Sequence, residues 1–277
     1  MSGEPVERIA PLGERLIFAM GGGGFTMEPT NPLLDDFVLS LAGAKEPRIL
    51  FLPTASGDTT AQINAFKDRF AERTCVPEHL SLFRLRDARR TLEEVVLGQD
   101  IIYAGGGSLR NLLAIWRAHG LDRLLVRAWQ AGTVLAGLSA GAMCWFQGGV
   151  SRSSGPPEAM SGLGLLDGSL TVHADGEPER LPVWLGAARD GTLPGGWALE
   201  DGVGLLFRGL SMERAVSSRP GAGAERVDAI AGELVRRRIE VELLRDRPGD
   251  ALGGVDEAVQ ELRRLHRMRR GIGGAER

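Results

Sequence analysis

The sequence has few cysteines, few lysines and no long hydrophobic segment, and each shortage excludes a class of protein. Its two cysteines, Cys75 and Cys144, lie far apart in a chain of 277 residues, so they indicate neither a disulfide framework nor a metal cluster. No apolar run approaches the roughly 18 residues that cross a bilayer. The polar start of the chain, Met1 to Arg8, lacks the apolar region of a secretory signal. We therefore expect a cytoplasmic protein that does not bind membranes.

Positive charge is carried almost entirely by arginine, because Lys45 and Lys67 are the only lysines. The formal net charge of −3 combines a basic C-terminus with an acidic remainder, since residues 263–277 contain six arginines against Glu276. A nucleic-acid-binding arm would need aromatic partners on its basic face, and none accompanies this segment. We expect residues 246–277 to be a charged extension, partly helical (near 255–268) or disordered, that binds no nucleic acid.

Short apolar runs alternate with helical patterns through the first half of the chain. The runs expected to form strands are Arg15–Met20, Arg48–Pro53, Leu80–Leu85, Asp100–Ala104 and Thr133–Leu138. The stretches expected to form helices are Pro32–Ala42, Thr59–Arg73, Leu92–Leu97 and Leu109–Gln130, the last broken near Gly120. Strands that alternate with helices of about 10–15 residues predict a mostly parallel sheet covered on both faces.

The pattern changes after Ser139. A short helix is expected to continue over Met143–Phe146, and residues 148–168 are expected to be mostly loop and hairpin. Further elements are expected at Ser169–His173, Glu179–Asp190, Trp197–Phe207, Met212–Val216 and Leu234–Leu244, of which the second is a helix and the last two are antiparallel finishing strands. No linker interrupts the chain before about Asp246, so residues 1–245 are predicted to form a single α/β hydrolytic domain.

Ser139 is the strongest candidate for a nucleophile. The residues from Gly137 to Gly141 fit the G-x-S-x-G pattern of a nucleophile elbow, a sharp strand-to-helix turn that exposes the serine hydroxyl. A sequence this rich in glycine meets such a pattern easily by chance, so the motif alone is weak. Its context strengthens it, because Ser139 ends a clear apolar strand and begins a helix of small residues.

A serine nucleophile needs a base, and the chain offers four histidines. His79 and His119 occupy ordinary surface or helix-terminal positions, and His266 lies in the arginine-rich tail. His173 follows an apolar strand, where α/β proteins gather functional groups. We therefore predict His173 as the general base.

Several acids could orient that base. Asp175, Glu177 and Glu179 follow His173 directly, whereas Glu200 and Asp201 follow the apolar run that begins at Trp197. Spacing alone does not choose among them. An orienting carboxylate must be shielded from water, which favours the acids between apolar runs over those in the polar loop.

Two glycine clusters follow predicted strands. Residues 105–107 would let a backbone N–H approach a ligand oxygen, so one of these amides and that of Ala140 could form an oxyanion hole. Residues 21–24 suggest a dinucleotide-binding loop, but the third glycine of G-x-G-x-x-G is missing, since Thr26 and Met27 stand where it would be needed. The sequence therefore indicates no nucleotide and no other cofactor.

Six segments in order resemble the peptidase E and cyanophycinase family of serine peptidases. They are the glycines at 21–24, ILFLPTAS, YAGGGSLRNLLAIWRAHGLD, GTVLAGLSAGAMCWF, VHADGEPER and GWALEDGVGLLF, and the resemblance as a whole covers about Arg15 to Val241. The resemblance implies a flavodoxin-like three-layer α/β fold related to class I glutamine amidotransferases. It also implies Ser139 as nucleophile, His173 as base, Asp201 (with Glu200 adjacent) as the third member, and Gly106 and Ala140 as oxyanion donors.

The sequence departs from the family pattern at two positions. An aspartate with a site role in aspartyl dipeptidases of the family corresponds to Ser154 here, so the acid must come from elsewhere, which favours Asp201. The family's GGGNT is GGGSL here, with Ser108 in place of Asn. Ser108 is therefore a candidate substrate contact, and the replacement argues against the family's specificity for Asp-X peptides. Arg152 is the candidate partner for an acidic substrate side chain.

We therefore predict a serine peptidase that hydrolyses dipeptides or short peptides, some with N-terminal Asp, through a Ser–His–Asp triad and an acyl-enzyme. Alternatives are a cyanophycinase-like isopeptidase, a serine esterase and a non-enzymatic ligand-binding protein. In an esterase of the α/β-hydrolase type, the triad residues follow one another along the chain as Ser, acid, His. Here that order would require Asp167 with His173, or a later acid with His266. No metal is expected. The sequence does not determine the oligomeric state, and a homodimer is one of the alternatives.

Overall fold

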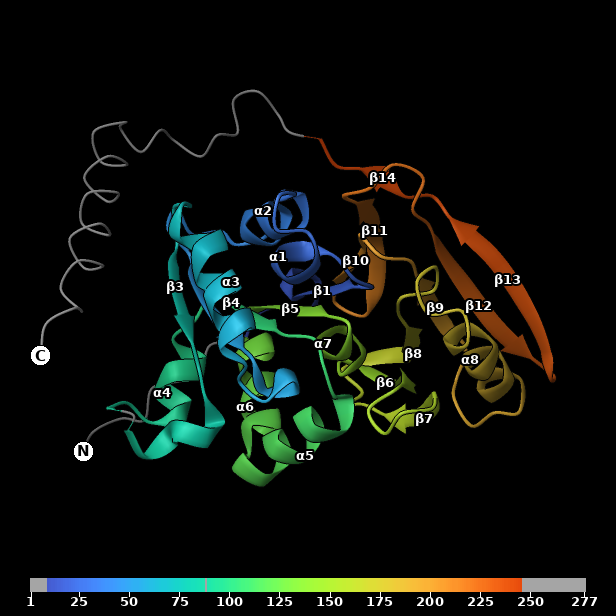
Figure 1. Ribbon diagram of the computed structural model, residues 1–277, viewed down its shortest axis with the longest axis horizontal. Helices are drawn as coiled ribbons and strands as arrows, with labels where there is room; N and C mark the ends of the chain where they lie inside the picture. The colour runs from blue at the N-terminus through green and yellow to red at the C-terminus, as the bar shows by residue number, and fades with distance from the viewer. Residues whose placement is uncertain (1–8, 88, 246–277) are drawn as a thin grey trace, which may run out of the picture.

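The computed structural model describes residues 9–87 and 89–245, which form two β-sheets with helices packed around them (Figure 1). The strands of the larger sheet are β1 (Leu16–Met20), β2 (Arg48–Leu52), β3 (Val76–His79), β4 (Ile101–Ala104), β5 (Val134–Leu138), β10 (Val203–Arg208), β11 (Ser211–Ser217) and β14 (Glu242–Leu243). Their order across the sheet is β14-β11-β10-β1-β5-β4-β2-β3. Strands β1 to β5 are parallel to one another, whereas β10 pairs antiparallel with β1 and with β11.

Helices cover both faces of the larger sheet. One face carries α1 (Gly24–Met27), α2 (Leu33–Ser40) and α3 (Thr60–Ala71), and the other carries α4 (Leu92–Leu97), α5 (Leu109–His119) and α6 (Leu121–Ala131). The continuous apolar runs of the strands explain this arrangement, because alternate side chains enter opposite cores. In β1, for example, Phe18 enters one core cluster and Ile17 the other. The α/β fold with a mostly parallel sheet and antiparallel strands is therefore confirmed.

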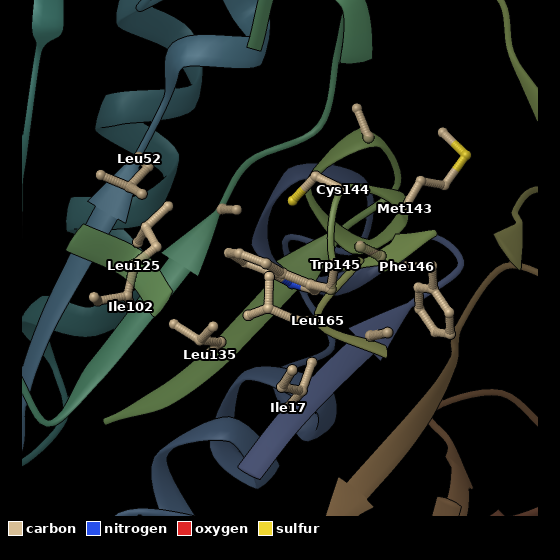
Figure 2. Close-up of a cluster of buried hydrophobic side chains, with 14 of the residues drawn as sticks. Ile17, Leu52, Ile102, Leu125, Leu135, Met143, Cys144, Trp145, Phe146 and Leu165 are labelled. Atoms are coloured by element: carbon tan, nitrogen blue, oxygen red, sulfur yellow. The ribbon is translucent and has the colours of Figure 1, made fainter. Parts of the chain in front are cut away.

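The second sheet was not expected as a separate unit. Its strands are β6 (Phe146–Ser151), β7 (Glu158–Ser161), β8 (Leu166–Thr171), β9 (Gly196–Leu199), β12 (Ala224–Ile230) and β13 (Glu233–Ile239), in the order β13-β12-β9-β8-β6-β7. One face packs against the larger sheet, so that Trp145, Phe146 and Leu165 point into the same cluster as Ile17 and Leu135 (Figure 2). The other face is covered by α8 (Arg180–Arg189), whose Trp184 is fully buried.

Two strands predicted from apolar runs were misplaced. Residues 80–85 are not a strand: Leu80 enters the core from the irregular segment after β3 and Leu82 from a 3₁₀ helix, Leu82–Asp87, whereas the strand lies upstream as β3. β3 is the last strand of its sheet, which accommodates Pro77 because an edge strand can lack a ladder donor. The run Trp197–Phe207 is divided between β9 and β10 by a turn at Gly202, whose φ is +81°.

Other differences concern the ends of elements in the second half. The helix expected over Met143–Phe146 is α7, which covers Ala140–Met143, and Phe146 already opens β6. The region 148–168 contains the antiparallel pair β6–β7, as the hairpin prediction implies. The finishing run Leu234–Leu244 contains both β13 and β14, and β14 pairs with β11 in parallel.

Residues 246–277, with the helix expected near 255–268, lie outside the described residues. The division of the chain into a domain of residues 1–245 and a charged extension stays a prediction. Within residues 9–87 and 89–245, the structure contains no helix of the length and apolarity that a bilayer crossing requires.

Candidate active site

Ser139 occupies a sharp turn between β5 and the short helix α7. Its backbone has φ +53° and ψ −112°, a conformation that L-residues rarely adopt. The turn is compact because its glycines touch other backbone: a Cβ on Gly137 would collide with the carbonyl of Gly141, and one on Gly141 with the carbonyl of Ala104. The hydrogen bond from Ser139 N–H to Met20 O, 3.0 Å long, fixes the turn at the carboxyl end of β1.

His173 follows β8 and faces the serine. Its Nε2 lies 2.9 Å from Ser139 Oγ, within hydrogen-bonding distance. The histidine backbone also has a positive φ, +54°, and the loop after it is closed by a 2.8 Å bond from Glu177 N–H to His173 O. Ser139 and His173 are thus two of only four non-glycine residues with positive φ among the described residues. Such strained backbone is concentrated at functional sites.

Asp201 supports His173 from the opposite side of the ring. It lies in the turn between β9 and β10, and its Oδ1 is 2.5 Å from His173 Nδ1. Its backbone N–H donates to Asp175 Oδ1 at 2.8 Å. The neighbouring Glu200 points elsewhere, because its Oε2 accepts the Gly223 N–H at 2.8 Å. The structure therefore brings Ser139, His173 and Asp201 into one hydrogen-bonded line and leaves Glu200 out of it.

The surroundings of Asp201 favour its ionised form. Burial, which leaves the residue 9% exposed, opposes ionisation. The hydrogen bond from His173 and the positive charges of Arg219 and Arg180 outweigh burial, so the pKa of Asp201 lies below its ordinary value. A shielded carboxylate that stays ionised is suited to orient an imidazole ring.

The first glycine cluster makes room for this pair. A Cβ on Gly22 would lie 2.7 Å from Cγ of Asp201 and 3.0 Å from Nδ1 of His173, which is too close for either group to keep its place. One on Gly21 would lie 2.7 Å from Cβ of Leu199 and 2.6 Å from the carbonyl of Glu200. Sequence reasoning weighed these glycines only as a nucleotide loop and missed their role. Their position at the end of β1, beside the end of β5, was the signal that could have revealed it.

The second glycine cluster lies beside the serine. A Cβ on Gly106 would be 3.4 Å from Cβ of Ser139, and one on Gly107, whose φ is +139°, would collide with the carbonyl of Ala55. Within the described residues, the backbone N–H groups of Gly106 and Ala140 donate no hydrogen bond to the protein. Backbone donors without a protein acceptor on residues beside a serine nucleophile can stabilise an anion that forms there.

The two predicted substrate contacts are already engaged within the protein. Ser108 is the N-cap of α5, and its Oγ accepts the Asn111 N–H at 3.2 Å. Arg152 Nη1 forms ion pairs with Glu177, at 3.5 Å, and with Glu179, at 3.0 Å. Any substrate group must share these side chains with their present partners.

The loop acids near His173 also have structural partners. Glu177 binds Arg180 at 2.8 Å, and although burial raises its pKa, the hydrogen bond and charge of Arg180 bring it below the ordinary value. Asp167, which an α/β-hydrolase order would pair with His173, instead accepts from Gln147 Nε2 at 3.3 Å. His266, the other histidine of that alternative, lies outside the described residues. No three His, Cys, Asp or Glu side chains of the described residues gather as a metal ligand set.

The structure has an α/β fold in which a serine, a histidine and an aspartate are linked by hydrogen bonds at the strand ends. This arrangement is typical of a serine hydrolase. The family model described as Peptidase family S51 matches residues 17–215. The chain therefore belongs to Peptidase family S51 and is a serine-type peptidase, which confirms the resemblance expected from the sequence.

Individual relatives agree with this assignment. The chain is 45% identical over 228 residues to a protein of Bacillus subtilis (strain 168) named uncharacterized peptidase YgaJ, a match that covers 82% of this chain and 98% of the relative. A shorter match, 37% identical over 94 residues, is to the imidazole glycerol phosphate synthase subunit HisH of Geobacillus thermodenitrificans (strain NG80-2) and covers 32% of this chain and 42% of that one. This second match supports the expected relation to class I glutamine amidotransferases.

Among solved structures, the crystal structure of a peptidase from an acI-B1 Actinobacterium has the same fold. The two structures align with a TM-score of 0.63 at 19% identity, and the alignment covers 82% of this chain and 94% of the other. At this low identity the comparison supports the fold alone.

Proposed function

We propose that this peptidase hydrolyses dipeptides and other short peptides through a catalytic triad of Ser139, His173 and Asp201. The observation that carries the proposal is the unbroken hydrogen-bonded line. Asp201 Oδ1 lies 2.5 Å from Nδ1 of the imidazole, and Nε2 lies 2.9 Å from Ser139 Oγ. An ionised Asp201 accepts a hydrogen bond from the Nδ1–H group of His173, which keeps the proton on Nδ1 and leaves the Nε2 lone pair directed at the serine hydroxyl.

In the proposed reaction, Ser139 Oγ bonds to the carbonyl carbon of the scissile peptide while its proton passes to His173 Nε2. The carbonyl electron pair moves onto oxygen, and collapse of the tetrahedral intermediate expels the amine, which takes the proton from Nε2. Water then attacks the acyl carbon and gives a proton to the same nitrogen. The C–Oγ bond breaks, Ser139 Oγ takes the proton back from Nε2, and the acid product leaves. Asp201 stays ionised throughout and stabilises the imidazolium.

We further propose that the N–H groups of Gly106 and Ala140 stabilise the oxyanion of each tetrahedral intermediate. Their position beside Ser139 and their lack of protein acceptors support this role. Loss of one such donor typically costs about 10²–10³ in turnover. A side chain at position 106 would lie close to Ser139, so Gly106→Ala should lower turnover by crowding the site.

The substrate class rests on the resemblance to peptidase E. A substrate aspartate could pair with Arg152, but it would compete with Glu177 and Glu179, which already bind that guanidinium. Ser108 Oγ is occupied as an acceptor, and its O–H can still donate to a substrate carbonyl. We therefore propose short peptides as substrates with at most weak selection for N-terminal Asp.

A panel of substrates tests these proposals. Wild-type protein would be assayed with Asp-Leu, Ala-Leu and Leu-Leu for peptidase activity and with p-nitrophenyl acetate for esterase activity. Ser139→Ala should abolish peptide hydrolysis, whereas Ser154→Ala, a serine of the exposed loop 152–157, should not change it. Peptide hydrolysis that persists in Ser139→Ala would refute the proposed nucleophile, and hydrolysis of the ester alone would favour the esterase alternative.

A further inference from the structure

The turn that carries Asp201 is held by a group of residues outside the proposed triad. Glu28, which follows α1, forms an ion pair with Arg219, and its Oε2 accepts the Ser218 hydroxyl at 2.7 Å. The Glu28 side chain is 9% exposed, so this pair is shielded on one side. Glu28 thus joins the segment that follows β1 to the segment that follows β11, although the two are distant in sequence.

Both joined segments hold Gly202, the residue after Asp201. Gly202 N–H donates to Gly22 O at 3.1 Å, and Gly202 O accepts the Ser218 N–H at 2.9 Å. The Arg219 side chain lies over the same residue, since a Cβ on Gly202 would be 2.8 Å from Cδ of Arg219. The turn is therefore fixed from both sides, and the Glu28–Arg219 pair connects the two sides.

Charge reinforces this geometry. The groups that act on Asp201 are His173 through its hydrogen bond, the cations Arg219 and Arg180, and Asp175, which accepts the Asp201 N–H. Arg180 is also bound by Glu177 and Arg219 by Glu28, while the carboxylate of Glu200 is directed at Gly223. Arg219 is thus a cation whose charge stabilises the ionised Asp201 carboxylate and whose guanidinium is paired with Glu28.

We propose that Glu28 and Arg219 are positioning residues that hold Asp201 against His173. The inference rests on the proposed triad, because it assigns these residues an effect on catalysis through Asp201. Neither residue forms a hydrogen bond with Ser139 or His173 among the described residues, so any effect on reactivity must pass through the turn. Since a cation near the His173–Asp201 pair disfavours its protonation, loss of Arg219 should let the pair take up a proton at higher pH.

The test measures how fast diisopropyl fluorophosphate labels the protein between about pH 5 and about pH 9, because the labelling rate reports nucleophile activation without a known substrate. The variants are Arg219→Gln, Arg219→Lys and Glu28→Gln. Arg208→Gln is the matched control: the Arg208 side chain, 46% exposed against 37% for Arg219, also pairs with a glutamate, Glu213, but it lies at the opposite end of β10, next to Leu16.

We expect Arg219→Gln to lower the labelling rate at its plateau about tenfold and to move the acidic limb of the pH profile up by about 0.5 pH unit. Glu28→Gln should show a smaller change in the same direction, because Arg219 remains but is no longer held. Arg219→Lys should keep most of the wild-type labelling rate and leave the acidic limb at its wild-type pH, since lysine keeps the positive charge. Arg208→Gln should match the wild type, and circular dichroism should show that every variant is folded.

The effect must also depend on Asp201. When Arg219→Gln is added to Asp201→Asn, the rate should fall no further and the limb should not move, because the group through which Arg219 acts is gone. A folded Arg219→Gln protein with the wild-type rate and limb would overturn the inference, as would an equal loss in the Asp201→Asn background. Neither result would affect the proposed triad, whose nucleophile is tested separately by the labelling of Ser139→Ala.

Discussion

Replacement of Gly22 by alanine tests whether the first glycine cluster serves the catalytic site. The new methyl carbon would lie 2.7 Å from Cγ of Asp201 and closer still to the carboxylate oxygen bound to His173. The methyl group is fixed to the backbone, and the Asp201 carboxylate lies nearer to it than the imidazole, whose Nδ1 is 3.0 Å away. The Asp201 side chain must therefore rotate away, which breaks its hydrogen bond to Nδ1.

The size of the effect follows from this displacement. To move from 2.7 Å to an ordinary carbon–carbon contact of about 3.5 Å, Cγ of Asp201 must retreat by about 0.8 Å. A misplacement of about 1 Å costs roughly 10² in rate, and complete loss of an orienting aspartate costs about 10⁴. Turnover by Gly22→Ala should therefore fall by roughly 10² to 10⁴. Because a side chain can rotate to relieve the clash, the stability cost should stay near about 1 kcal/mol.

The assay compares kcat for peptide hydrolysis with the thermal unfolding midpoint. Gly22→Ala should lose turnover while its midpoint falls by only about 2–4 °C. Gly43→Ala is the control, because a Cβ there meets no atom within 4 Å, and it should match the wild type in both measurements. Wild-type turnover by Gly22→Ala would refute the claim that this glycine makes room for the His173–Asp201 pair.

Three further predictions concern the acids and a helix cap. Asp201→Asn should lower kcat about 10⁴-fold, whereas Asp175→Asn and Glu177→Gln should retain most activity in the same assay, since an asparagine at 175 still offers an acceptor to the Asp201 N–H. The lowered pKa of Asp201 means that its contribution to stability is present above its ordinary pKa of 3.8 and is lost as the pH falls below it. Thermal unfolding between about pH 2 and about pH 5 should therefore depend less steeply on pH in Asp201→Asn. Thr91→Ala removes the capping box at α4 and should lower the free energy of unfolding, measured in urea, by about 1 kcal/mol without a change in kcat.

Each of these predictions has a contrary result. Near-wild-type kcat in folded Asp201→Asn would move the orienting role to Glu200 or to the loop acids. Equal acid sensitivity in the wild type and Asp201→Asn would show that the carboxylate contributes nothing to folding through its ionisation. A fall in kcat in Thr91→Ala would mean that α4 influences the site, contrary to the structure's placement of that helix.

The parallel strands β1, β2, β4 and β5 could be predicted because each is buried on both faces almost throughout and is therefore a continuous apolar run. The division of residues 197–207 was harder to see, since the runs on both sides of the turn are buried and the turn itself is only three residues long, Glu200, Asp201 and Gly202. Strands β12 and β13 carry many exposed charged side chains, so no apolar run revealed the first of them. The second sheet was missed for that reason.

The candidate site shows a similar limit. Ser139 and His173 could be proposed from sequence because each ends a strand, and strand ends gather at one edge of a parallel sheet. The choice of Asp201 over Glu200 needed the structure, because it depends on which side chain a tight turn directs at the imidazole. The roles of Gly22 and Glu28 depend on contacts between residues far apart in sequence, which no local pattern encodes.

The central claim is that Ser139 is the nucleophile activated by His173 and Asp201. Mass spectrometry of the protein after treatment with a fluorophosphonate tests it most directly, since the reagent forms a stable adduct with an activated serine. The account predicts one adduct per chain, on Ser139, none in Ser139→Ala, and slow labelling in Asp201→Asn. An adduct on a different residue, or undiminished labelling of Ser139→Ala, would contradict it.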